Sequence, residues 1–390
     1  MPDTDDIRGE VRSWIAEHRI DGLPPTGAHP PYDSEPSPAE VEWLERLRAG
    51  RWLCLSWPEA YGGRALGVSD VIAVNEEFAA AGLPRPQPGM GESLVAPAIL
   101  AHGTDRQKAE LLPRILSGAD VYCQGFSEPD SGSDLASLRT VGVVDGDEVV
   151  VTGSKIWTSG AHKANVIFTL CRTDPDAPRH RGISYVLVPM ADNGIEIRPL
   201  RQMAGDFGFN QVFFDRARAP LANVIGGLHN GWRVAMTTLA SERGGTATTQ
   251  HLGYLAEWQR LVDLARRTGA IERPTIRDDL ARAYGAVRIM EFAGRRLAAD
   301  LRAGNDGGPQ ASIGKVFWSE YHRWFGELAM AVAGAAATVR PDGPGYPVTE
   351  MQRIFLESRA RTIARGSSQV QRNIIAERAL DLPRDPAGVG

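Results

Sequence analysis

The spacing of apolar residues changes twice along this chain of 390 residues. From Ser37 the segment SPAEVEWLERLRAG has apolar residues at helical spacing, a capping box of Ser37 with Glu40, and a stop signal at Gly50. Between about residues 122 and 222 the apolar residues form short β-branched runs instead, and long helical patterns return after Asn230. We therefore expect three consecutive domains: a helical one over 1–120, a β one over 121–225 and a helical one over 226–390.

The middle region carries the strand signals. Asp145-Gly146 lies between β-branched runs in VVDGDEVVVTG, which predicts a two-residue hairpin. Other short runs rich in Val, Ile and Phe are separated by polar, Pro or Gly stretches. They predict an antiparallel sheet or a small barrel, with strands in ANVIFTLCR, GISYVLVPM, GIEIRPL and QVFFD.

The flanking regions carry helix signals. Thr104 and Gln107 form a second capping box, in TDRQKAELLPRILSG. After residue 230 the apolar periodicity predicts a bundle of four or five helices. These are expected over about 232–268, 276–303, 312–339, 348–365 and 368–380.

Composition and missing motifs exclude several classes of function. A formal net charge of -5 provides no general attraction for nucleic acid or anionic lipid. The acidic N-terminus and the lack of long apolar runs predict a cytoplasmic protein without a membrane segment. The sequence lacks GxGxxG after a strand, GxxxxGK[ST], HExxH and GxSxG, and its eight histidines are scattered, so no metal site is predicted.

The middle region contains the segments FSEPDSGSD, from Phe126, and GSKIWTSGAH, from Gly153. Both resemble signatures of the acyl-CoA dehydrogenase family. The resemblance continues in family order through RGISYVLVPM, QMAGDFGFNQVFFDRARAP and GSSQVQRNIIAERAL. It implies an α+β fold with an N-terminal helical domain, a middle β-barrel or sheet domain and a C-terminal four-helix bundle.

The resemblance also implies FAD as cofactor. In the family, the first segment holds the pyrimidine edge of the flavin, and the second covers the ring and hydrogen-bonds N5, a role that falls here to Ser159. For Ser127 and Ser133 the alternative is turn capping, and for Trp157 it is core packing. The matching FAD-binding positions are Gln124, Phe126, Ser127, Gly132, Ser133, Trp157, Thr158, Ser159, Ser367 and Gln369.

The family reaction needs a carboxylate that removes the α-proton while the flavin takes the β-hydrogen as hydride. In many members this base precedes the last helix, where the present chain has Arg365, which stays protonated. In other members the base lies on the first bundle helix, which matches Glu242. Glu242 is thus the predicted base, and the alternative is a solvated glutamate or one paired with Arg243.

Three residues are predicted to contact the acyl-CoA substrate. Ser133 lies where substrate and cofactor meet in the family, and Arg243 matches a family arginine near the CoA moiety. Arg365 leaves three alternatives open: a backbone N–H donor to the thioester oxygen, a guanidinium paired with Glu242 or a polar substrate group, or a surface arginine.

One departure from the family concerns the adenosine half of FAD. The family's Arg-x-x-Phe-Gly and the Gln that follows it are missing from ARRTGAIERPTIRDDLA. This favours a homo- or hetero-tetramer in which another subunit contributes to the flavin site. An electron-transferring flavoprotein is the expected acceptor, and straight, branched, aryl and steroid-derived acyl groups all remain open. The alternative functions are a partner subunit of a heteromeric dehydrogenase and a flavin monooxygenase or oxidase on the same fold.

Overall fold

The computed structural model describes residues 4–31, 33–84, 89–305, 309–339 and 348–383, without the side chains of 242–246. Contacts divide the chain into two compact units, which are described separately. The bundle unit comprises Met1–Pro30, Leu66–Arg85 and Arg243–Gly390, and the sheet unit comprises Pro31–Ala65 and Pro86–Glu242. This division does not test the three consecutive domains expected from the sequence, whose boundaries stay a prediction.

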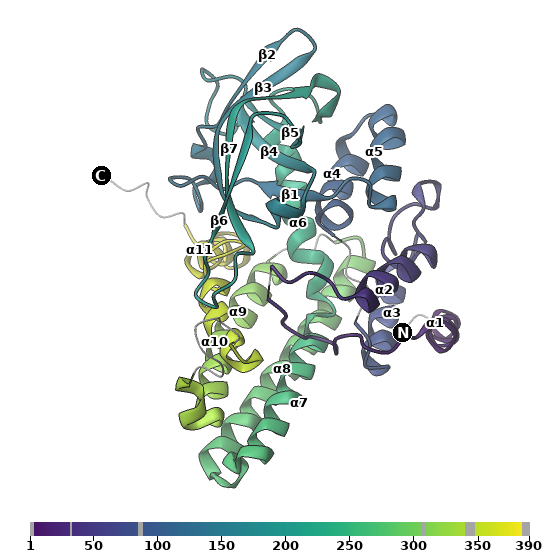
Figure 1. Ribbon diagram of the computed structural model, residues 1–390, viewed down its shortest axis with the longest axis vertical. Helices are drawn as coiled ribbons and strands as arrows, with labels where there is room; N and C mark the ends of the chain where they lie inside the picture. Colours follow the sequence, from purple (N-terminus) through teal and green to yellow (C-terminus); the bar gives the residue numbers. More distant parts are fainter. Residues whose placement is uncertain (1–3, 32, 85–88, 306–308, 340–347, 384–390) are drawn as a thin grey trace. The chain divides into compact units, whose positions relative to one another are not determined.

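The sheet unit is built around a mixed β-sheet (Figure 1). Within the described residues its eight strands are β1 (Tyr122–Gly125), β2 (Val141–Asp145), β3 (Glu148–Ser159), β4 (Val166–Arg172), β5 (Ile183–Pro189), β6 (Ile195–Leu200), β7 (Phe209–Pro220) and β8 (Val224–Ile225). The order is β6-β7-β3-β2-β4-β5-β8, and β1 pairs with β4. Most neighbours are antiparallel, as expected, but β1 and β2 both pair with β4 in parallel.

The predicted hairpin joins β2 to β3, one residue later than expected. Asp145 pairs with Glu148, so the two loop residues are Gly146 and Asp147. Gly146 has a φ of 65°, which glycine adopts without steric cost. Buried side chains of β3, β4, β5 and β7 form one apolar cluster, to which β3 contributes Val149 and Val151.

Four helices accompany the sheet in this unit. Both predicted capping boxes are present: Ser37 with Glu40, and Thr104 with Gln107. Each caps two backbone N–H groups that a helix start would otherwise leave unpaired. The helices are α2 (Pro38–Ala49), α4 (Ala96–His102), α5 (Asp105–Ser117) and most of α6 (Gly231–Ala247).

The bundle unit consists of long helices packed around an apolar core. They are α1 (Asp5–His18), α3 (Val68–Ala80), α7 (Gln250–Thr268), α8 (Pro274–Arg302), α9 (Gln310–Ala333), α10 (Glu350–Arg361) and α11 (Ser368–Ala379). Helix α9 packs against α7, α8, α10 and α11 (Figure 1). The core contains Leu261, Val287, Phe325 and Ile354, each almost fully buried, and burial of one such side chain contributes about 1.5–3 kcal/mol.

The expected single helix over 232–268 is wrong, because the chain breaks it between α6 and α7 at Thr248 and Thr249. Both threonines are buried. Gly294 of α8 packs against this break, and a Cβ at that position would lie 2.8 Å from the carbonyl oxygen of Thr248. The backbone of α8 therefore approaches the break as closely as only glycine allows.

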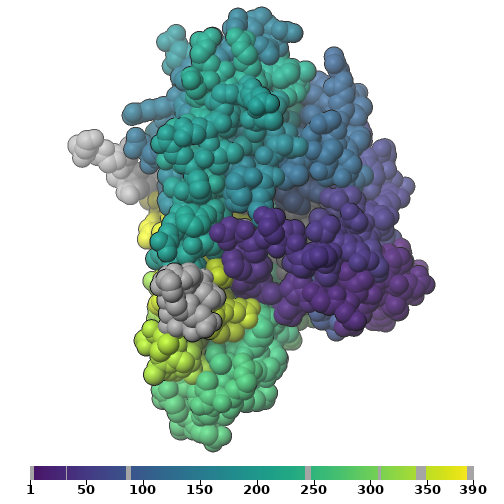
Figure 2. All heavy atoms as spheres, in the orientation of Figure 1, coloured from purple at the N-terminus to yellow at the C-terminus, as the bar shows by residue number. Residues whose placement is uncertain are grey.

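Figure 2 shows all heavy atoms of the chain as spheres, in the orientation of Figure 1. In the part of the chain that is described, no helix combines the length and the apolar character that crossing a membrane requires.

Candidate active site

The FSEPDSGSD segment forms a tight loop after β1. Glu128 and Ser131 exchange two backbone hydrogen bonds of 2.9 and 3.1 Å, and the Ser131 hydroxyl donates to the Asp134 carbonyl at 2.8 Å. The Ile156 N–H donates to the Ser127 carbonyl at 2.9 Å. The two segments that resemble family signatures are thus joined to each other through the main chain.

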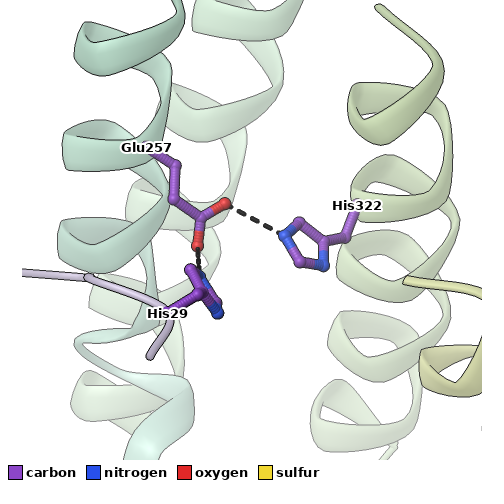
Figure 3. Close-up of side chains that lie close together, drawn as sticks. All are labelled: His29, Glu257 and His322. Carbon is purple, nitrogen blue, oxygen red and sulfur yellow. Dashed lines mark hydrogen bonds and ion pairs between the residues drawn. The ribbon is translucent and has the colours of Figure 1, made fainter. Parts of the chain in front are cut away.

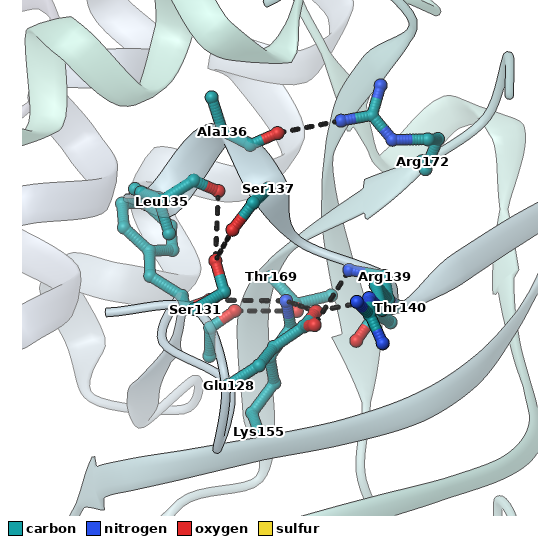
Figure 4. A network of polar contacts seen from close by, with 12 residues as sticks. Glu128, Ser131, Leu135, Ala136, Ser137, Arg139, Thr140, Lys155, Thr169 and Arg172 are labelled. Atoms are coloured by element: carbon teal, nitrogen blue, oxygen red, sulfur yellow. Dashed lines mark hydrogen bonds and ion pairs between the residues drawn. The ribbon is translucent and has the colours of Figure 1, made fainter. Parts of the chain in front are cut away.

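A buried ion pair braces this loop from behind (Figure 4). Lys155 of β3 is fully buried, and its Nζ donates to Glu128 Oε1 at 2.8 Å and to the Phe126 carbonyl at 3.2 Å. The Glu128 carboxylate also accepts the N–H groups of Arg139, at 2.7 Å, and Thr140, at 2.9 Å. Burial opposes ionisation of Glu128, but Lys155 and these hydrogen bonds outweigh it and lower the pKa of the carboxyl.

Trp157, Thr158 and Ser159 lie where β3 is irregular. The register with β7 shifts between Lys155 and Thr158, and Trp157 at this bulge has a φ of 61°. A bulge redirects the side chains that follow it, and a non-glycine residue at this φ stores about 1–2 kcal/mol. The Trp157 indole remains 58% exposed and contacts Phe209 edge-on, so the core-packing alternative for Trp157 is not what the structure shows.

Two polar groups of the sheet unit fit a bound flavin. Gln124 Nε2 and Thr158 Oγ1 are buried, and neither has a hydrogen-bond partner among the described residues. A buried polar group without a partner costs about 1–3 kcal/mol. A ligand that presents hydrogen-bonding atoms beside an exposed indole would remove this cost, which is what the pyrimidine edge and ring of a flavin offer.

The other predicted sheet residues differ in exposure. Phe126 is buried and packs edge-on against Phe168 and Tyr185, so its side chain belongs to the core and only its main chain is left for a cofactor. Gly132 and Ser133 are exposed at the end of the loop. Ser127 is partly buried, and its carbonyl is used by Ile156.

Three further predicted residues lie in the bundle unit, around the start of α11. Ser367 is the N-cap of this helix, and its hydroxyl accepts the Val370 N–H at 3.2 Å. Gln369 is exposed in the first turn. Arg365 is also exposed and has a φ of 59°, and its carbonyl accepts a hydrogen bond from Gln371 Nε2 at 3.2 Å.

The predicted base and its neighbour occupy the last turns of α6. The backbone at Glu242 and Arg243 is helical, but their side chains lie outside the described residues. Their roles, like those of the other predicted site residues, stay predictions.

Comparisons with known proteins show the family to which the chain belongs. The N-terminal, middle and C-terminal domains of acyl-CoA dehydrogenases match residues 2–119, 123–217 and 229–380. The chain belongs to the acyl-CoA dehydrogenase family. It is an oxidoreductase of a family of flavoproteins that act in lipid metabolism, which confirms the predicted family, fold and enzyme class.

Named relatives cover this acyl-CoA dehydrogenase from end to end. A protein of Mycobacterium tuberculosis named acyl-CoA dehydrogenase IpdE1 is 42% identical over 100% of both chains. A solved structure titled Tcur3481-Tcur3483 steroid ACAD is 32% identical over 98% of both chains, with a TM-score of 0.83. A chain in the crystal structure of the ChsE4-ChsE5 complex from M. tuberculosis is 32% identical to the present chain. The match covers 99% of each of the two compared chains, with a TM-score of 0.80.

The Glu128–Lys155 brace was missed by the sequence reasoning. Both residues lie inside the segments that carry the family resemblance, FSEPDSGSD and GSKIWTSGAH. One signal was available, because a lysine in a strand of otherwise apolar character needs a buried anion. The sequence did not show which carboxylate would provide it.

Proposed function

We propose that this chain binds FAD and desaturates an acyl-CoA thioester between its α and β carbons, with Glu242 as the base. The observation that carries the proposal is the braced loop of the sheet unit, together with the unpartnered groups of Gln124 and Thr158 and the exposed Trp157, which precedes Thr158 in β3. FAD, when bound, supplies the acceptor for the β-hydrogen, which leaves the substrate as hydride.

The residues of the chain then have distinct tasks. Glu242 takes the α-proton, since a carboxylate is a suitable general base and Arg365 cannot release its proton near neutral pH. Gln124, Thr158 and Ser159 hydrogen-bond the flavin, and Trp157 covers it. The backbone N–H of Arg365 donates to the thioester oxygen as negative charge develops there.

Ser133 and Arg243 complete the proposed substrate contacts, with Arg243 near the CoA moiety. Phe126, Ser127 and Gly132 shape the loop at the flavin edge, and Ser367 and Gln369 contact the cofactor from the start of α11. An electron-transferring flavoprotein is the proposed acceptor of the electrons.

We propose a steroid-derived acyl group as the substrate class. The support is the 32% identity over nearly the whole chain to a structure titled as a steroid ACAD. Two solved relatives are named as pairs of different chains, Tcur3481-Tcur3483 and ChsE4-ChsE5. With the altered ARRTGAIERP segment, these names support a hetero-tetramer in which a related subunit completes the flavin site.

The test is a panel of straight, branched, aryl and steroid-derived acyl-CoA thioesters, offered with FAD under anaerobic conditions to the chain alone and to the chain co-expressed with a related subunit. We expect loss of the oxidised-flavin absorbance and a product thioester lighter by two hydrogens, most rapidly with a steroid-derived substrate. Flavin reduction only by straight-chain thioesters contradicts the substrate class. Absence of any desaturated product contradicts the reaction.

Co-expression with a related subunit tests the assembly. We expect the chain alone to bind FAD weakly and to gain stoichiometric FAD and turnover with the partner. Tightly bound, stoichiometric FAD and full turnover in the chain expressed alone would exclude the heteromer.

A further inference from the structure

Two histidines and a glutamate from three separate segments meet in the bundle unit (Figure 3). Glu257 lies on α7 and His322 on α9, and His29 lies in the segment that follows α1. The Glu257 carboxylate contacts His29 Nε2 at 2.7 Å through one oxygen and His322 Nε2 at 3.0 Å through the other. In the described part of the chain, this is the one group of three such side chains whose ligand atoms lie within 4.8 Å of one another.

The segment that carries His29 is fixed to one face of α7. Gly27 packs on Gly253, where a Cβ on Gly27 would lie 2.9 Å from the Gly253 carbonyl oxygen. Arg260 of α7 donates to the carbonyls of Thr26, at 2.9 Å, and Gly27. Positions 253, 257 and 260 lie on the same face of a helix, because they are spaced by four and three residues. The histidine is therefore held over Glu257 by contacts that do not involve the histidine itself.

Aromatic rings lie next to the cluster. The Tyr254 ring lies 5.1 Å from the His322 ring, and Phe325 stacks on that histidine at 6.4 Å. The charged groups of Glu357 and Arg361 also act on His29. The side chains of Glu257 and His322 are 4% and 2% exposed, whereas that of His29 is 19% exposed. An ion would reach the cluster past His29 and would be held in surroundings that strengthen its attraction to the carboxylate.

We propose that His29, Glu257 and His322 bind a divalent transition-metal ion of the Zn²⁺ class. Two imidazoles and one carboxylate are a recurring three-residue donor set for zinc, with a water molecule in the fourth position. Tetrahedral coordination at about 2.0–2.1 Å places neighbouring ligand atoms about 3.3 Å apart. The two Glu257–His contacts of 2.7 and 3.0 Å would open by a few tenths of an ångström, and the two imidazole nitrogens, which lie within 4.8 Å of each other, would settle at the same spacing.

The metal would join the N-terminal segment to helices α7 and α9, a structural role separate from the flavin chemistry. The sequence predicted no metal because its histidines are scattered. His29 and Glu257 are 228 positions apart, and Glu257 and His322 are 65 apart. The fold brings together donors whose spacing matches no zinc motif.

Co²⁺ added to the EDTA-treated full chain provides the direct test, because tetrahedral Co²⁺ with nitrogen and oxygen ligands absorbs visible light. We expect one Co²⁺ per chain, displaced by Zn²⁺. Both His29→Gln and His322→Gln should weaken binding by about 100-fold or more, because loss of even an outer partner of a metal ligand costs 10–100-fold. His180→Gln is the matched control, since His180 is exposed and packs on Trp232, and it should bind as the wild type does.

A second readout does not depend on colour or on activity. Zn²⁺ should raise the thermal unfolding temperature of the wild type and of His180→Gln, because a ligand that binds only the folded chain stabilises it. It should not raise that of His29→Gln, a substitution in a partly exposed segment that leaves the helix core intact. Absence of visible bands and of bound Zn²⁺ in the wild type would overturn the proposal, as would equal binding by the His29 and His180 variants.

Discussion

Glu128 of the sheet unit and Glu257 of the bundle unit are both buried carboxylates with cationic partners, but their partners differ in kind. Glu128 faces a lysine and two backbone N–H groups. Glu257 faces two imidazoles, and His322 Nδ1 has no hydrogen-bond partner among the described residues. Burial opposes the charge on Glu257, but His322 and His29 outweigh it and lower the pKa of this carboxyl.

The two sites differ in how firmly their geometry is set: the Glu128–Lys155 brace holds one arrangement, whereas the cluster of His29, Glu257 and His322 can rearrange around a metal ion. Lys155 and the backbone donors fill the bonding capacity of Glu128 and hold one geometry, which suits a loop that must present groups to a cofactor. Imidazoles are common metal ligands, which is the role proposed for His29 and His322. The same carboxylate chemistry therefore supports positioning in one unit and the proposed metal binding in the other.

Lys155→Met should produce the largest loss of stability. It leaves the Glu128 carboxylate buried without its cation, and breaking a buried ion pair from one side costs about 3–5 kcal/mol. Urea unfolding measures the change. Lys163→Met is the matched control, because Lys163 forms a surface ion pair with the exposed Glu35 and should cost at most about 1 kcal/mol. Equal losses in the two variants would show that the brace does not hold the loop.

Glu257→Gln should cost less, about 1–3 kcal/mol in the presence of EDTA. The amide still offers a hydrogen-bonding group to the two histidines, so the substitution leaves no buried carboxylate without a partner. Urea unfolding again measures the effect, with Glu327→Gln as the exposed control, which removes an ion pair with Arg359. A loss of unfolding free energy as large as that of Lys155→Met would show that Glu257 is as firmly held by its partners as Glu128 is.

Trp157→Gly should change stability least, by about 1 kcal/mol or less in either direction. Glycine adopts a φ of 61° without strain, which offsets the lost edge contact with Phe209. Under the proposed function, FAD binding weakens although the fold is intact. Thermal unfolding and a fluorescence titration with FAD measure the two effects. A loss above about 3 kcal/mol would mean that the indole supports the core rather than the cofactor.

Local signals predicted much of the fold. The capping boxes at Ser37 and Thr104 and the turn around Gly146 each depend on neighbours within three residues, so the sequence shows them directly. The break at Thr248 was missed because it depends on the close packing of Gly294, far along the chain. Helix periodicity alone carries no information about such a contact.

Whether a site residue could be predicted likewise depended on whether the prediction needed only local sequence or also distant contacts. Residues in contiguous segments, such as Ser127 and Trp157, were predicted through their resemblance to a family, and their roles stay predictions. The partner of Lys155 and the meeting of His29 with His322 depend on the tertiary fold, and neither was predicted. Glu242 was predicted from the resemblance to family members whose base lies on the first bundle helix, after Arg365 had been excluded because it stays protonated.

The rate of flavin reduction in Glu242→Gln tests the central claim most directly. A single turnover under anaerobic conditions, with the most reactive acyl-CoA, compares this variant with the wild type and with Glu272→Gln, an exposed glutamate of the bundle unit. We predict unchanged FAD content and a rate lowered by about 10²–10⁴-fold in Glu242→Gln only, the usual contribution of a general base. Reduction at the wild-type rate would contradict the assignment and place the base elsewhere.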